Sequence, residues 1–390
     1  MTTHRITSFF ALSSAAVMLV LSGCAGTTSG TQAADDASGI SASQAQGVAS
    51  SAEYQDLIKK TGVEISYNAD GSRVLTDNDG VKVDLPAQVD RVANLWDANN
   101  QVMLMLGSPE KIVATTQQIS KMPWYNRVYP KISEASVPVN GSDVNTEELL
   151  KAKPDVVISV DKALVDKARG ASLSAVHLGF QDYAGLKKTV VMTAEVIGTD
   201  EARSRALSYI KYLEGNLQKV TDKTASLSES ERPKVLHIAG GSDVTKVDGS
   251  DSIIGEWMKA AGARNSIDGV ANYKNISVEQ IISSAPDQII IGNSDAQKGI
   301  DTITSDTAWA DVPAVKNGKL YRNPVGTFKW DRYSTEEALQ ILWAAQHFHP
   351  DLFADINLVH ETQTFYRTYY NYELSDEEAQ RILAGDNPGT

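Results

Sequence analysis

The chain carries an internal repeat, which limits the folds that it can adopt. Residues 145–160 read NTEELLKAKPDVVISV and residues 277–292 read SVEQIISSAPDQIIIG. Aligned without gaps, the copies match at Glu147 and Glu279 and at a Pro-Asp pair that stands before an apolar run. Each copy predicts a short capped helix ended by proline, followed by a strand whose β-branched residues suit a parallel sheet buried on both faces. Two copies in one chain therefore predict two similar α/β lobes.

The segments around the repeat set the expected domain boundaries. An N-terminal α/β lobe with a leading hairpin is expected at residues 52–182, because two Asp-Gly turns divide an alternating stretch near its start. A helical pattern without proline predicts a connecting helix at residues 183–229, interrupted only at Gly-Thr-Asp (198–200). A C-terminal α/β lobe with C-terminal helices is expected at residues 230–390. The predicted fold class is therefore α/β, with two lobes and one connection.

The single cysteine, Cys24, follows an apolar run near the start of the chain, in the string LVLSGCAG. The run is shorter than the ~20 residues that a membrane-spanning helix needs, but it suits the core of a signal peptide. The string Leu-Ser-Gly-Cys resembles the bacterial lipobox, in which the cysteine is acylated and becomes the mature N-terminus. Residues 1–23 are therefore expected to be a lipoprotein signal peptide and residues 24–51 a flexible tether. An ordinary secretory signal with an incidental cysteine is the alternative.

This interpretation predicts the location of the protein. Acylated Cys24 would hold it in the lipid bilayer, on the extracytoplasmic side of the cell membrane. That side is the periplasm in a host with two membranes, or the outer face of the cytoplasmic membrane in a host with one.

Charge and motif content argue against several classes of function. The formal net charge is −13, and no basic stripe that could neutralise phosphates is present, so nucleic acid is not an expected partner. The sequence contains no Gly-x-Ser-x-Gly elbow, phosphate-binding loop or dinucleotide fingerprint. His347 and His349 are two residues apart, so on a helix they cannot share a metal. We expect no catalytic residues and no metal ligands; an exported hydrolase with an unrecognised site is the alternative of a different class.

Five strings in order resemble a known family. They are VDLPAQVDRVANLWDAN, LMLGSPEKIVATT, NTEELLKAKPDVVI, SVEQIISSAPDQIII and VGTFKWDRYSTEEALQILWAAQHFHPDLF, within about residues 80–355. This stretch is similar to the bacterial ABC-importer substrate-binding lipoproteins for iron chelates, haem and vitamin B12. The resemblance implies two Rossmann-like lobes joined by a single long helix, with the ligand cleft between the lobes. It also implies a monomer, without enzymatic activity, that delivers its ligand to the transmembrane subunits of an ABC permease, with Glu147 and Glu279 docking onto permease arginines.

The ligand site is expected on loops at the carboxyl ends of the strands. Aromatic side chains with a few charges in such loops suit a large, partly planar chelate, whose faces stack while its edges accept hydrogen bonds. The expected ligand-binding residues are Trp96, Asp97, Trp124, Tyr125, Arg127, Lys329, Trp330 and Arg332.

A ferric chelate of the siderophore or haem type is the expected ligand, and no cofactor is expected. Cobalamin is one alternative. Molybdate or tungstate is another, because Arg127, Lys329 and Arg332 could bind a small oxyanion.

Overall fold

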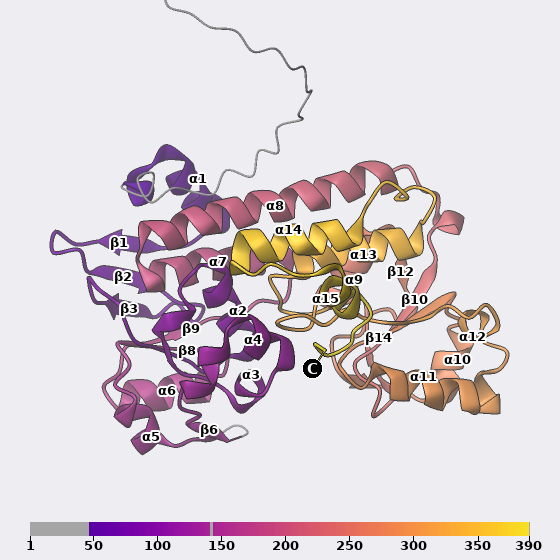
Figure 1. Ribbon diagram of the computed structural model, residues 1–390, viewed down its shortest axis with the longest axis horizontal. Coiled ribbons are helices and arrows are strands. Elements are labelled where there is room, and N and C mark those ends of the chain that lie inside the picture. Colours follow the sequence, from indigo (N-terminus) through magenta and orange to yellow (C-terminus); the bar gives the residue numbers. More distant parts are fainter. Residues whose placement is uncertain (1–46, 141–142, 390) are drawn as a thin grey trace, which may run out of the picture. The chain divides into compact units, whose positions relative to one another are not determined.

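The computed structural model describes residues 47–140 and 143–389 (Figure 1). The predicted signal peptide, Cys24 and most of the predicted tether lie outside the described residues. Within the described ranges, no helix combines the length and the apolar character that crossing a membrane requires.

The N-terminal lobe is built on a parallel sheet with helices around it. Four strands lie in the order β5-β4-β8-β9. They are β5 (Ile112–Ala114), β4 (Val92–Asn94), β8 (Val156–Ser159) and β9 (Ala175–His177). Its helices are α1 (Ala52–Thr61), α2 (Asp97–Met105), α3 (Gln117–Ser120), α4 (Pro123–Val128), α5 (Thr146–Lys151) and α6 (Lys162–Gly170). The short strands β6 (Val139–Asn140) and β7 (Asp143–Val144) form a separate antiparallel pair.

The stretch that predicted a leading hairpin forms a small sheet of three antiparallel strands. These are β1 (Ile65–Tyr67), β2 (Arg73–Thr76) and β3 (Lys82–Leu85), in that order. The turns between them contain Gly71 and Gly80, whose φ values of 85° and 77° lie in the left-handed region that glycine adopts without strain. The two Asp-Gly pairs of the sequence therefore mark two turns.

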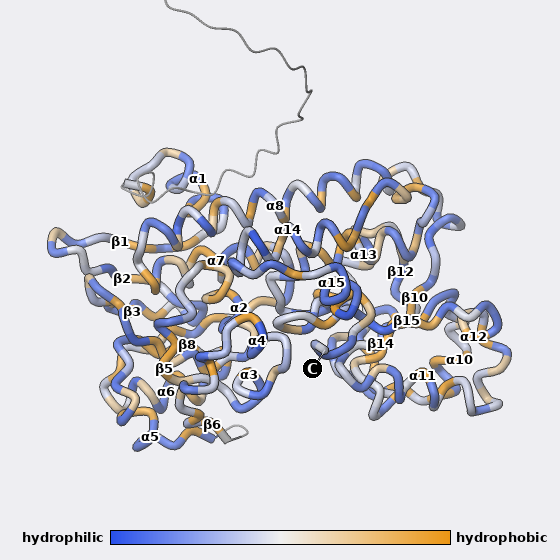
Figure 2. Tube along the Cα trace, viewed as in Figure 1, coloured by the Kyte–Doolittle hydropathy of each residue, from blue (hydrophilic) through white to orange (hydrophobic). Residues whose placement is uncertain are grey.

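The C-terminal lobe contains a six-stranded mixed sheet. Its order is β13-β11-β10-β14-β15, with β12 paired to β10. The strands are β10 (Lys234–Ile238), β11 (Lys246–Asp248), β12 (Arg264–Asn265), β13 (Lys274–Asn275), β14 (Gln288–Ile291) and β15 (Leu320–Arg322). The surrounding helices are α9 (Ile253–Ala260), α10 (Val278–Ser283), α11 (Ala296–Ser305) and α12 (Pro313–Lys316). Figure 2 shows apolar residues along the strands of both lobes, whereas α11 and α8 alternate between polar and apolar residues.

The helical pattern between the lobes forms two helices, α7 (Tyr183–Ile197) and α8 (Asp200–Thr224). They separate at Gly198, whose φ is 78°, and the side chain of Thr199 caps α8 by accepting from the Ala202 amide. The left-handed backbone favours glycine at this position, and a Cβ there would lie 2.5 Å from Nη2 of Arg73, which would have to shift. Helix α8 is the long connection between the lobes, and this two-lobed α/β architecture confirms the predicted fold class.

The last helices of the chain pack back along this connection. They are α13 (Glu337–Phe348), α14 (Leu358–Tyr370) and α15 (Asp376–Leu383). Helix α13 packs on α8, and α14 reaches α2 in the N-terminal lobe. Figure 1 shows α14 lying along α8. The C-terminal part of the chain therefore contacts both lobes.

The repeat is preserved in backbone detail. In both copies the residue before the proline has a left-handed backbone: φ is 47° at Lys153 and 48° at Ala285. The aspartate after the proline then accepts a backbone hydrogen bond from the start of the neighbouring strand. Asp155 Oδ2 accepts from the Arg91 amide at 2.9 Å, and Asp287 Oδ2 accepts from the Lys234 amide at 2.8 Å. The two lobes therefore position α5 and α10 in the same way against their sheets.

Candidate functional site

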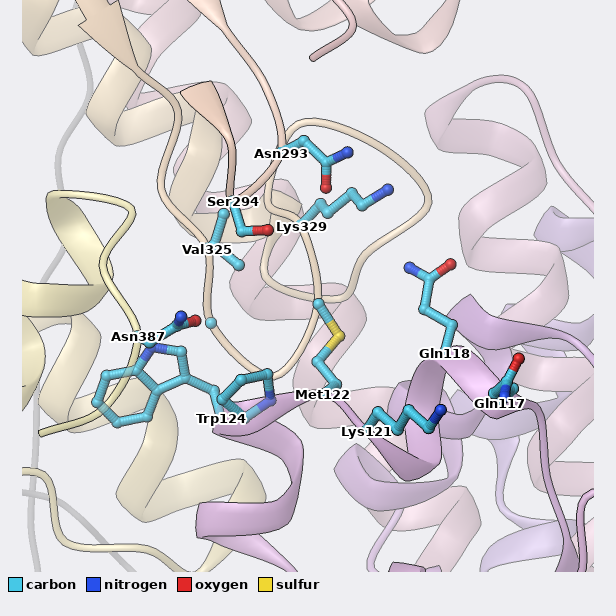
Figure 3. A pocket seen from close by; sticks show the side chains of 12 residues that line it. Gln117, Gln118, Lys121, Met122, Trp124, Asn293, Ser294, Val325, Lys329 and Asn387 are labelled. Carbon is cyan, nitrogen blue, oxygen red and sulfur yellow. The ribbon is translucent and has the colours of Figure 1, made fainter. Parts of the chain in front are cut away.

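A cavity of about 560 Å³ lies between the two lobes. Its lining residues come from segments that follow the carboxyl ends of β5, β14 and β15, and from the end of the chain (Figure 3). The lining residues are Gln117, Gln118, Lys121, Met122, Pro123, Trp124, Asn293, Ser294, Val325, Gly326, Lys329 and Asn387. This is the edge of the sheets at which α/β proteins place ligands.

The N-terminal wall is formed by α3 and α4. Thr116 caps α3 by accepting from the Ile119 amide at 3.3 Å, and its hydroxyl donates to the Asp97 carboxylate. The capped turn exposes Gln117, Gln118 and Lys121 toward the cavity. Asp97 is not among the lining residues, but it holds this turn through Thr116 and lies close enough to Lys329 for their charges to interact.

The C-terminal wall is formed by the ends of β14 and β15. Asn293, two residues after the end of β14, has a left-handed φ of 71°. Gly326 cannot be replaced freely, since a Cβ there would lie 2.2 Å from Glu336 Oε1. The half-buried ammonium group of Lys329 also lines this wall, and burial lowers its pKa although the Asp331 carboxylate opposes that effect.

A buried network fixes the loop after β15 against the N-terminal lobe. Gln101 of α2 donates to Glu336 Oε2 at 2.6 Å and to Thr327 Oγ1 at 2.8 Å. In return, Gln101 Oε1 accepts from the Thr335 amide at 2.7 Å. The pKa of Glu336 is raised to about 7, because the effect of burial exceeds the opposing effect of the hydrogen bond that the Tyr366 hydroxyl donates to this carboxyl group. The wall that carries Lys329 is thus joined to both lobes.

The described lining residues carry positive charge and no negative charge, although Asp331, Asp97 and Asp295 lie close enough to Lys329 to act on its pKa. The lining residues include two lysines, Lys121 from one lobe and Lys329 from the other, and no carboxylate. Side-chain amides and a hydroxyl supply further hydrogen-bond donors, and Trp124 is the single aromatic residue among them. No group of His, Cys, Asp or Glu in the described part of the chain is arranged to hold a metal ion by itself. The cavity is therefore suited to an anionic ligand that brings its own metal or none.

The structure brings two of the eight predicted ligand residues to the cavity, Trp124 and Lys329. Trp96 is buried edge-to-face against Phe180, with the ring centroids 5.7 Å apart. Tyr125 is buried, and its hydroxyl donates to the Asn100 carbonyl at 2.9 Å. Trp330 is also buried. Ligand contact by any of the predicted residues stays a prediction.

Both predicted arginines have protein partners. Arg127 is exposed and pairs with Glu378 at 3.2 Å. Arg332 is buried, and its Nη2 lies 2.7 Å from Asp248 and 2.9 Å from Asp331. Each guanidinium is therefore engaged outside the cavity lining.

Arg332 belongs to a buried ion cluster that holds the loop carrying Lys329. His237 lies between the same two carboxylates, with Nδ1 2.8 Å from Asp248 and Nε2 3.1 Å from Asp331. Two carboxylates balance one guanidinium and one imidazolium, so the cluster is neutral when His237 is protonated. Burial lowers the pKa of His237, but hydrogen bonds to the two aspartates outweigh it and the net pKa is raised.

This cluster predicts a pH-dependent stability. Folding raises the pKa of His237, so its protonation stabilises the folded protein. This stabilisation is complete at pH values below the pKa in the unfolded chain, about 6.5, and it is lost as the pH rises through the pKa in the folded protein. We expect His237→Gln to lower stability by about 3–5 kcal/mol at pH 6, because it leaves one buried carboxylate without its partner. The loss should shrink as pH rises. Thermal unfolding from pH 5.5 to 9 measures both effects. The variant His360→Gln, at an exposed histidine, is the control. A loss of stability in His237→Gln that does not vary with pH would contradict a protonated His237 in the cluster.

Most of the cavity lining was missed by the sequence analysis. The loop that contains the predicted Trp124 also contributes Gln117, Gln118, Lys121 and Met122 to the lining. The residues expected to bind ligand in this loop are aromatic residues and an arginine, so these four were not predicted. Asn293 and Ser294 could have been found, because they follow directly after the apolar run of the second repeat. Asn387 carries no local signal of a binding role.

Three comparisons connect the chain to known proteins. A family model described as "Periplasmic binding protein" matches residues 92–325. The molybdate-binding protein MolA of Haemophilus influenzae is 24% identical over 345 residues, which cover 81% of this chain and 96% of that protein. The Fe(3+)-citrate-binding protein YfmC of Bacillus subtilis is 23% identical over 199 residues, covering 49% and 60% respectively.

Solved structures show the same architecture. A periplasmic solute-binding protein from Veillonella parvula superimposes with a TM-score of 0.69 at 25% identity. The match covers 82% of this chain and 97% of that one. Most of this chain therefore shares its fold with a known solute-binding protein.

Proposed function

The chain belongs to the periplasmic binding protein family and is an ABC-transporter substrate-binding protein, and we propose that it captures an anionic metal complex, in the first place a ferric chelate. Members of this family are transport receptors and not enzymes, which confirms the prediction of a non-enzymatic protein and removes the hydrolase alternative.

The observation that carries the proposed ligand class is the charge of the cavity. Lys121 and Lys329 come from opposite lobes, and no carboxylate stands among the described lining residues. This local charge is opposite in sign to the net charge of −13 of the whole chain. A local excess of positive charge in an acidic protein selects anions near the site while the rest of the surface repels them.

The lining also bears on the form of the anion. A volume of about 560 Å³ suits an organic chelate, and the amides of Gln117, Gln118 and Asn293 can bind carboxylate or hydroxyl oxygens. Haem and corrinoid rings present broad faces that aromatic side chains stack on, but Trp124 is the single aromatic residue among the described lining residues. A ferric complex of a carboxylate-rich chelator fits these features better, and similarity to a ferric-citrate-binding protein supports it.

A small oxyanion is the second candidate. Molybdate is favoured by the similarity to MolA, which extends over 81% of this chain. Two lysines and several amide donors could surround a tetrahedral anion if the lobes close around it.

Native mass spectrometry and titration calorimetry test the ligand. Protein purified from its own host is examined for a bound adduct, and ferric citrate, sodium molybdate, sodium tungstate, haem and cobalamin are titrated into the stripped protein. Binding of ferric citrate or of molybdate supports the anionic class and selects between the two candidates. Tight binding of cobalamin, with neither anion bound, would overturn the proposal.

The lipid anchor is a second part of the proposal. Cys24 stands in the lipobox string, outside the described residues. A single acyl chain binds membranes only marginally, so a lipoprotein needs the two or three chains that this cysteine would carry. We expect Cys24→Ala to appear as soluble protein or as unprocessed precursor. Membrane fractionation measures the change, and a variant that sediments with membranes as the wild type does would rule out the anchor.

A further inference from the structure

We propose that the C-terminal segment, residues 371–389, is a strap across the mouth of the ligand cavity that joins the two lobes and must loosen for ligand exchange. The proposal rests on the assignment of the cavity as the ligand site. The segment contains α15 and the residues after it, and Asn387 is one of the cavity-lining residues. Figure 3 shows Asn387 beside the indole of Trp124.

On one side, the strap is bound to α4 of the N-terminal lobe. The indole Nε1 of Trp124 donates to the Asp386 carbonyl at 2.8 Å. One helical turn further, Arg127 donates to Glu378 at 3.2 Å and to the Tyr372 hydroxyl at 3.1 Å. The two residues that bind Arg127 also bind each other, because the Tyr372 hydroxyl donates to Glu378 at 2.9 Å. Of the three side chains of α4 predicted to bind ligand, Trp124 and Arg127 are therefore engaged by the strap.

On the other side, the strap is bound to the C-terminal lobe near the end of β15. Arg322 pairs with the Asp386 carboxylate at 2.7 Å. The Val325 amide donates to the Ile382 carbonyl at 3.2 Å, next to the cavity-lining loop. Asp386 therefore binds one lobe through its backbone and the other through its side chain. The salt bridge pairs the carboxylate of Asp386, the residue before the cavity-lining Asn387.

The strap is held by a buried apolar face and by exposed polar contacts. Ala379 and Ile382 are buried, so α15 has an apolar face on the core. By contrast, the Arg127 side chain is half exposed, and ion pairs of that kind contribute little to stability. Local opening would therefore release the exposed polar contacts of the strap while α15 keeps its apolar face on the core. Opening here would separate Trp124 from Asp386 and uncover the cavity on the side of Asn387.

Hydrogen exchange in the ligand-free protein tests the strap without any ligand. We expect Arg127→Glu to speed amide exchange across residues 376–389, because it places two like charges in contact. The double variant Arg127→Glu with Glu378→Arg should return exchange toward the wild-type rate. Arg264→Glu, which breaks the Arg264–Glu229 pair on β12, is the matched control and should leave these residues unchanged. Unchanged exchange in Arg127→Glu would overturn the strap.

Ligand kinetics test the role in exchange, with ferric citrate and sodium molybdate as separate probes. In Arg127→Glu we expect the dissociation rate of the bound probe to rise about tenfold, since affinity changes act mainly on dissociation. Asn387→Asp should weaken binding of either anion more than Asn387→Ala does, because only the former adds negative charge to the lining. Equal affinities of both variants and wild type would remove Asn387 from the site. If the wild type binds neither probe, the proposed ligand class fails, and hydrogen exchange alone decides the strap.

Discussion

Reversing two exposed charges, Glu147→Arg together with Glu279→Arg, is expected to abolish uptake of the ligand while leaving ligand affinity and melting temperature near wild type. Both glutamates are exposed in the first turn of their helices, α5 and α10. We propose that they dock the two lobes onto arginines of the membrane permease. Neither residue lines the ligand cavity, so the defect should be confined to delivery.

The internal symmetry of the chain supports a shared role for the two residues. The left-handed residues before the prolines and the backbone contacts of Asp155 and Asp287 show that α5 and α10 are held equivalently in their lobes. A carboxylate in the first helical turn is stabilised by about 0.3–1 kcal/mol through the helix dipole, whatever its function. The helix dipole explains why each helix has a glutamate in its first turn. It gives no reason why replacing both glutamates should impair transport more than the two single replacements do. Docking by both lobes predicts that the double variant is far worse than either single one.

The experiment needs a matched charge control. Glu64→Arg with Glu134→Arg makes the same change in net charge at exposed glutamates outside α5 and α10. Transport in cells, complex formation with the permease in detergent, and calorimetry of ligand binding are measured on both double variants. An exposed ion pair contributes about 0–1 kcal/mol, so complex formation should also weaken with added salt. Normal transport by the Glu147/Glu279 variant would show that these residues only start helices.

The sequence was sufficient to predict the two lobes, because their signals are local. Each copy of the repeat contains a cap, a proline stop and a buried apolar run, which fix a helix and the following strand without distant partners. The helical pattern of the connection and its interruption are both visible in the sequence. Gly198 and Thr199 divide the connection into α7 and α8, and only α8 forms the long connecting helix. The Gly-Thr-Asp interruption was visible, but no local pattern shows that Arg73 of β2 packs against Gly198.

The site was harder to predict because its composition depends on contacts that no local pattern records. Arg332 looks available in a polar loop, yet Asp248, distant in sequence, binds it inside the core. Arg127 looks like a ligand residue beside Trp124, yet α15 arrives from the end of the chain to pair with it. The rule that ligands bind at the carboxyl ends of strands located the correct loops. Which side chains of those loops face the cavity depends on the packing of the whole molecule.

Removing the two cavity lysines is expected to weaken ligand binding by different amounts. A hydrogen bond to a charged group contributes about 1.5–3 kcal/mol, so Lys329→Met should weaken binding of an anion about 10- to 100-fold. Lys121→Met should cost less, because Lys121 is exposed and its field is screened by water and salt, whereas Lys329 is half-buried. Methionine keeps much of the apolar stem of lysine, so the change isolates the charge.

The dependence on salt separates the two lysines further. Raising the ionic strength should reduce the difference between wild type and Lys121→Met but leave most of the difference between wild type and Lys329→Met. Calorimetry with ferric citrate and with sodium molybdate measures these affinities. Lys219→Met, on the exposed face of α8, removes the same charge away from the cavity and should bind as wild type does. If Lys329→Met also binds both anions with wild-type affinity, the positive charge of Lys329 has no part in ligand selection, and the charge of the cavity no longer supports the anionic ligand class.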